Sequence, residues 1–93
     1  MLTEVIGKPA MLEQAAEECT ELAHACLKMA RFMRKENKVY KSESEIKANL
    51  IEEIADVLVC ITELTGNNIV DSGDVTAQVE RKLHRMCVRL SEV

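Results

Sequence analysis

A long run of residues without a helix breaker constrains this fold most. Between Pro9 and Arg34 the chain is rich in Ala, Leu, Met, Glu and Gln, and its one proline stands at the first turn, where helices tolerate it. The run predicts a helix of about 25 residues, roughly 38 Å long at about 1.5 Å per residue. That length is large for a chain of 93 residues, so we expect other long helices to cover its apolar face.

Two more long helices follow from the same reasoning. The polar segment 35–44 and the turn-rich segment 66–73 predict loops, and no strand-like alternation or internal repeat is present. The expected elements are a short turn over residues 2–7, a helix from Glu45 to Thr65 capped by Ser42 or Ser44, and a helix that Ser72 or Asp74 opens and that ends near Leu90. The predicted fold is therefore all-α, an antiparallel bundle of long helices in one domain over residues 1–93, with its core over residues 9–90.

The second helix is apolar on two sides. One stripe contains Ile46, Leu50, Val57, Cys60, Ile61 and Leu64, and Ile51 and Leu58 lie outside it. A helix that is apolar on two sides needs more than one neighbour, and a short chain has few helices to supply. We therefore expect a homo-oligomer, either a homodimer or a dimer of dimers.

Charge and composition exclude several classes of protein. The hydrophobic fraction of 47% is that of a folded chain, and the net charge of −4 with only Phe32 and Tyr40 as aromatics argues against a nucleic-acid binder. The four cysteines form no C-x-x-C pair and are expected to be small buried hydrophobes in a reduced cytosol. No apolar run approaches the roughly 20 residues of a membrane span, so the prediction is a cytoplasmic protein without a membrane partner.

Two pairs of carboxylates stand where apolar residues are expected. Glu18 and Glu21 lie one turn apart, inside or at the edge of the first helix's apolar stripe. On the second helix Glu53 is central in the apolar stripe, and Asp56 follows it one turn later. Acids such as Glu13, Glu36 and Glu63 are expected to be exposed and need no explanation. Converging buried carboxylates repel one another and must be compensated.

Two kinds of compensation are available. Cations such as Lys28, Arg31, Lys82, Arg85 and Arg89 can supply structural salt bridges, or a divalent metal can bind between the two helices. A set of oxygen ligands suits Mg²⁺ or Mn²⁺ better than Zn²⁺ and leaves positions for water and substrate phosphates. The metal is the favoured interpretation, with Glu18, Glu21, Glu53 and Asp56 as ligands.

At this point the residues resemble a family. The segments EECTELAHACLK (17–28) and NLIEEIADVLV (49–59) are similar to the MazG-like all-α nucleoside triphosphate pyrophosphohydrolases, which carry E-x-x-E and E-x-x-D on consecutive helices. The resemblance extends over about residues 11–90 and includes Lys82 and Arg85 on the last helix. It implies a helical homo-oligomer that hydrolyses an NTP or dNTP to the monophosphate and pyrophosphate with Mg²⁺, in the clearance of unwanted nucleotides.

The resemblance also implies roles for single residues. Glu18, Glu21, Glu53 and Asp56 would hold the metal, and Glu21 is our choice for the base that takes a proton from water. The resemblance gives Lys82 and Arg85 as phosphate-binding residues. Charge balance at the leaving pyrophosphate adds Lys28 and Arg31, whereas Arg34 and Lys35 fit a basic helix end that complements its dipole. Glu80 stands where many members have Asn, and no aromatic is placed to sandwich a base, so the nucleotide stays open.

Two other functions fit parts of the pattern. Glu21 and His24 form an E-x-x-H, the spacing of di-iron bundle proteins, but the only other histidine, His84, has Arg81 three residues before it. The non-catalytic alternative is a helical interaction module in which Lys and Arg neutralise the acids across a subunit interface. That module predicts no stabilisation by Mg²⁺.

Overall fold

The computed structural model describes residues 2–36, 41–67 and 69–92, and over these ranges every regular element is a helix. The helices are α1 (Leu2–Ile6), α2 (Lys8–Arg34), α3 (Glu43–Gly66) and α4 (Ser72–Ser91). The all-α prediction is confirmed, and the long helices begin and end within two residues of the expected positions. None of the described helices is both long enough and apolar enough to cross a membrane.

Local chemistry explains where the helices begin and end. Gly7 separates α1 from α2 with a φ of 90°, a left-handed conformation that favours glycine, and Pro9 follows in the first turn of α2. The hydroxyl of Ser42 accepts a hydrogen bond from the backbone N–H of Glu45 at 3.2 Å, which confirms Ser42 as the cap of α3. Helix α4 begins at Ser72 as expected, although its cap is Asp71, whose carboxylate accepts from the N–H of Asp74.

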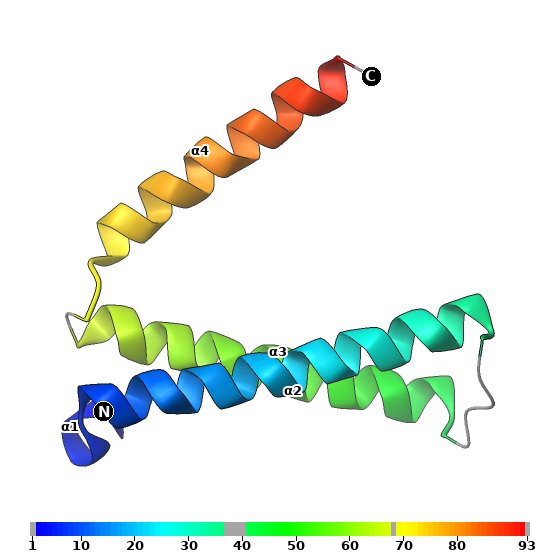
Figure 1. Ribbon diagram of the computed structural model, residues 1–93, viewed down its shortest axis with the longest axis horizontal. Coiled ribbons are helices and arrows are strands. Elements are labelled where there is room, and N and C mark those ends of the chain that lie inside the picture. Colours follow the sequence, from blue (N-terminus) through cyan, green and yellow to red (C-terminus); the bar gives the residue numbers. More distant parts are fainter. Residues whose placement is uncertain (1, 37–40, 68, 93) are drawn as a thin grey trace.

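Helices α2 and α3 form an antiparallel pair, called here the hairpin, and α1 packs against one end of it (Figure 1). The hairpin contains the whole buried apolar core of the described residues, formed by Met11, Ala25 and Met29 of α2 with Ile46 and Cys60 of α3. Two of the five buried side chains are methionines, as expected for a chain poor in aromatics. The same helices carry both carboxylate motifs, so the core fixes the geometry of the site.

Helix α4 diverges from the hairpin, and the two arms form an open V (Figure 1). No residue of α4 is buried, and the chain measures 44 × 42 × 17 Å. Ile51 and Leu58 of α3 are likewise exposed in a single chain. The expectation that all four cysteines are buried is wrong within one chain, because only Cys60 is buried and Cys19, Cys26 and Cys87 are exposed.

Candidate metal centre

The structure brings the two carboxylate motifs together across the hairpin. Glu18 and Glu21 project from α2, and Glu53 and Asp56 project from α3, so that one oxygen from each lies within 4.8 Å of the others. The i, i+3 spacing on each helix places both of its acids on the side that meets the other helix. These four residues are named the carboxylate cluster below.

Two oxygen atoms of the carboxylate cluster have no partner. Oε2 of Glu18 and Oε2 of Glu53 are buried and accept no hydrogen bond within the described part of the chain. Gln14, one turn before Glu18, donates from Nε2 to the other oxygen of Glu18 at 3.0 Å. Buried polar atoms are nearly always hydrogen-bonded, so these two oxygens leave the cluster with acceptor atoms that a ligand could use.

Burial and mutual repulsion disfavour the ionised form of two members. The pKa of Glu18 is raised, first by desolvation and then by the negative charges of Glu21 and Asp56. The pKa of Glu53 is raised by the same causes in the same order. Both shifts mean that a cation placed among these oxygens would relieve an unfavourable interaction already present in the folded chain.

Protein cations do not provide that relief within one chain. None of the described Lys or Arg side chains forms an ion pair with a member of the carboxylate cluster; the pair between Arg34 and Glu36 lies at an exposed helix end. The interpretation of the cluster as a structural salt-bridge network therefore has no support inside a single chain.

The donor atoms select the class of metal. The cluster consists of carboxylate oxygens alone, and neither His24 nor His84 belongs to a metal-binding group among the described residues. Hard, oxygen-only ligand sets suit Mg²⁺ or Mn²⁺, whereas di-iron bundle proteins add histidine ligands. The residues present fit Mg²⁺.

The expected phosphate-binding residues fall into two groups. Lys28 lies two turns after Glu21 on the same side of α2, and Arg31 lies further round that helix; both are exposed. Lys82 and Arg85 are exposed on α4, the arm that diverges from the hairpin (Figure 1). Only the α2 pair shares an element with the carboxylate cluster in one chain.

The burial of Glu63 contradicts a prediction from the sequence. This acid was expected to be exposed, but it is only 7% exposed, because α1 folds over it. Its carboxylate accepts hydrogen bonds from the backbone N–H groups of Leu2 and Thr3, from the Thr3 hydroxyl at 2.6 Å and from the Asn67 amide. The Thr3 bonds are the main cause that lowers the pKa of Glu63, so this acid stays ionised and anchors α1 to the end of the hairpin.

A small cavity connects Glu63 with the carboxylate cluster. It has a volume of about 180 Å³, and its walls include Met11, Gln14 and Cys60 beside Glu18 and Asp56. The sequence analysis did not identify Gln14 as a neighbour of the cluster. Its position one turn before Glu18, on the same face of the helix, would have predicted that contact. The cavity gives the cluster a partly apolar neighbour large enough for a small organic group.

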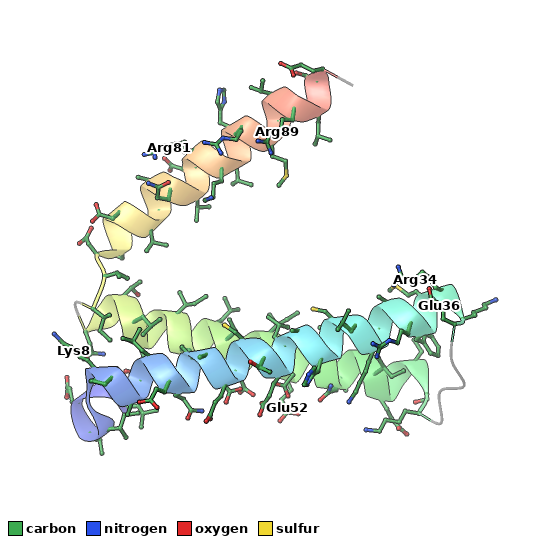
Figure 2. All side chains as sticks on the ribbon, in the orientation of Figure 1. Lys8, Arg34, Glu36, Glu52, Arg81 and Arg89 are labelled. Carbon is green, nitrogen blue, oxygen red and sulfur yellow. The ribbon has the colours of Figure 1, made fainter. Side chains whose placement is uncertain are left out.

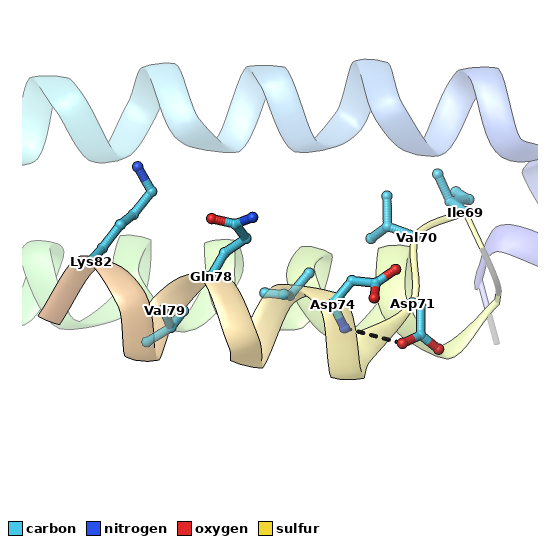
Figure 3. A pocket seen from close by; sticks show the side chains of 8 residues that line it. Ile69, Val70, Asp71, Asp74, Gln78, Val79 and Lys82 are labelled. Atoms are coloured by element: carbon cyan, nitrogen blue, oxygen red, sulfur yellow. Dashed lines mark hydrogen bonds between the residues drawn. The ribbon is translucent and has the colours of Figure 1, made fainter. Parts of the chain in front are cut away.

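A larger groove lies elsewhere, at the start of α4 (Figure 3). Its volume is about 610 Å³, and Val70, Val75 and Val79 line it together with Asp74 and Lys82. It shares no residue with the carboxylate cluster, and its two acids, Asp71 and Asp74, belong to no group of three or more possible metal ligands among the described residues. We therefore assign the chemistry to the hairpin and not to this groove.

Comparisons with known proteins do not place the chain in a family. No family model matches the chain, and no curated protein and no solved structure matches it.

Proposed function

We propose that this protein is a Mg²⁺-dependent nucleoside triphosphate pyrophosphohydrolase. The observation that carries the proposal is the carboxylate cluster, in which four acids from two helices lie within 4.8 Å of one another and two buried oxygens have no partner. The resemblance of residues 17–28 and 49–59 to the MazG-like enzymes supports the same reaction.

The reaction assigns a task to each group. When bound among the four carboxylates, Mg²⁺ (or Mn²⁺) would supply Lewis-acid polarisation of the triphosphate. Glu21, the most exposed of the four, accepts a proton from water as the water oxygen attacks the α-phosphorus. The bond from the α-phosphorus to the bridging oxygen then breaks, and pyrophosphate leaves with that electron pair.

Cations must balance the charge of the leaving pyrophosphate. Lys28 and Arg31 are placed to do so from α2, beyond Glu21. Lys82 and Arg85 lie on α4, away from the carboxylates of their own chain, so their part in phosphate binding requires an active form that is a homo-oligomer. The small cavity beside Glu18 and Asp56 adjoins the reacting centre.

The test is a product assay with matched variants. The protein is incubated with each common NTP and dNTP and Mg²⁺, and nucleoside monophosphate and pyrophosphate are quantified. Glu53→Gln should abolish turnover, whereas Glu52→Gln, an exposed neighbour outside the cluster, should preserve it. The proposal fails if no nucleotide is hydrolysed above the Glu53→Gln rate, or if the products are diphosphate and phosphate.

A further inference from the structure

Gln14 is the one described side chain outside the carboxylate cluster that donates a hydrogen bond to it. It stands one turn before Glu18 on α2, and its amide Nε2 donates to Oε1 of Glu18 at 3.0 Å. An ionised carboxylate only accepts hydrogen bonds, so the amide must present its nitrogen, and not its oxygen, to Glu18. The bond therefore fixes the orientation of the amide and engages one of the two carboxylate oxygens of Glu18.

The donor to the cluster is a neutral side chain and not a cation. Lys8 and Arg34 lie at opposite ends of the hairpin, and Arg81 and Arg89 lie on α4 (Figure 2). The cluster lies between the two ends of the hairpin, where the donor is an amide. An amide orients a carboxylate without cancelling its charge, so the cluster keeps the charge that attracts a metal cation.

The bond gives the two oxygens of Glu18 different roles. Oε1 is held by Gln14, whereas Oε2 is buried and accepts no hydrogen bond within the described part of the chain. Gln14 is itself partly buried and lines the small cavity beside the cluster together with Met11 and Cys60, which restricts its side chain. A metal at Glu18 therefore meets one free oxygen, Oε2, and a second contact would compete with the amide for Oε1.

Coordination by one carboxylate oxygen suits a small cation better than a large one. Mg²⁺ takes ligands in a near-ideal octahedron at about 2.0–2.1 Å, which leaves room for one oxygen from each carboxylate. Ca²⁺ takes about 6–8 oxygens at about 2.3–2.6 Å in a flexible arrangement and accepts both oxygens of one carboxylate. The bond from Gln14 thus withholds from Ca²⁺ an oxygen that Mg²⁺ does not need.

We propose that Gln14 is a positioning residue that holds Glu18 as a one-oxygen ligand and thereby sets the preference of the site for Mg²⁺ over Ca²⁺. This role rests on the proposed metal centre and adds to it a residue that acts through Glu18. Hydrogen-bond partners of metal ligands typically contribute about 10–100-fold to metal affinity. Loss of the amide should weaken Mg²⁺ binding by about that factor, and it should weaken Ca²⁺ binding less, because the freed Oε1 offers Ca²⁺ a second contact.

Metal titrations followed by thermal melts test this role without turnover. Gln14→Met keeps the length and unbranched shape of the side chain and removes the N–H donor, and Glu13→Gln, at the adjacent exposed position, is the control. Chelator-treated protein is titrated with MgCl₂ or with CaCl₂, and the rise in melting temperature gives the affinity for each ion. In Gln14→Met the ratio of the two affinities should shift toward Ca²⁺ by about tenfold, whereas Glu13→Gln should keep both wild-type affinities.

Two results would overturn the role of Gln14. One is a Gln14→Met protein with wild-type affinity for both ions, and the other is an equal loss for both ions, which is what a purely structural role predicts. Gln14→Leu removes the same donor and must show the same shift, so a folding defect in one variant does not decide the result. Glu53→Gln separates this role from the metal centre: if it keeps the wild-type response to Mg²⁺, the metal centre itself fails, and if only the Gln14 variants do, the metal centre stands and the role of Gln14 fails.

Discussion

Replacing Glu53 by Gln separates a metal site from a structural salt bridge. The substitution keeps the shape of the side chain and removes one of the four charges that converge within 4.8 Å. The raised pKa of Glu53 shows that its ionised form is disfavoured in the folded chain without metal. In chelator, Glu53→Gln should therefore melt at the same temperature as the wild type or at a higher one.

The size of the expected shift in melting temperature follows from the binding of Mg²⁺. The four oxygens form one cluster in each chain, so the single-site expression applies, and Mg²⁺ at ten times its dissociation constant stabilises the folded state by about 1.4 kcal/mol. A domain of 93 residues shifts its melting temperature by about 4–8 °C per kcal/mol. The wild type should then gain about 6–11 °C, and Glu53→Gln should lose most of that gain.

Thermal melts of both proteins, each with chelator and with Mg²⁺ at one protein concentration, measure these shifts. Glu52→Gln is the matched control, because it removes an exposed carboxylate next in sequence and should keep the full metal response. A Glu53→Gln protein that melts clearly below the wild type in chelator would refute the reasoning. It would mean that Glu53 is held by a cation across a subunit interface, as the interaction-module alternative requires.

Three other perturbations have defined outcomes. The pKa values of Glu18 and Glu53 are raised above the ordinary value of a glutamate, so the folded chain is most stable where both acids are protonated and loses stability as pH rises through their folded pKa values. Without metal, thermal melts should therefore show greater stability near about pH 5 than near about pH 7, and Mg²⁺ should reduce this difference. Met11 is 1% exposed, so Met11→Ala should lower the free energy of unfolding by about 2–5 kcal/mol in urea titrations, and a loss well below this would show that the site collapses around the cavity. Thr3→Val removes the hydroxyl donor to Glu63, so amide exchange over residues 2–6 should accelerate while that of α3 does not change.

The helices and the carboxylate cluster were predictable because both depend on local spacing. A 3.6-residue period fixes which side chains share a face, and it placed Glu18 and Glu53 in their apolar stripes before any packing was known. Ser42 was one of two candidate caps for the same reason, because an N-cap acts within four residues of itself, and its hydrogen bond to the Glu45 N–H decides between Ser42 and Ser44.

The errors concern contacts between segments distant in the sequence. Glu63 was expected to be exposed because it is an acid at the end of a helix, but its partners Leu2 and Thr3 precede it by about 60 residues. The hydrogen-bond donors that make its burial tolerable belong to α1, a helix of five residues that no periodicity could define. The direction of α4 relative to the hairpin was equally unpredictable, because it depends on what packs against α4 and not on the sequence of α4 itself.

The hairpin divides its surface between assembly and chemistry. By helical spacing, α3 carries the acids Glu52 and Asp56 on one side and Leu58 on the opposite side, so a partner can cover one side without closing the other. The core between these sides contains only five buried apolar side chains, and two unpartnered carboxylate oxygens adjoin it. Such a core leaves a single chain marginally stable, and the two proposed partners, a second copy and Mg²⁺, each relieve one source of the instability. If a second copy is one of these partners, dilution should lower the melting temperature even with Mg²⁺ present, and chelator should lower it further at a fixed protein concentration.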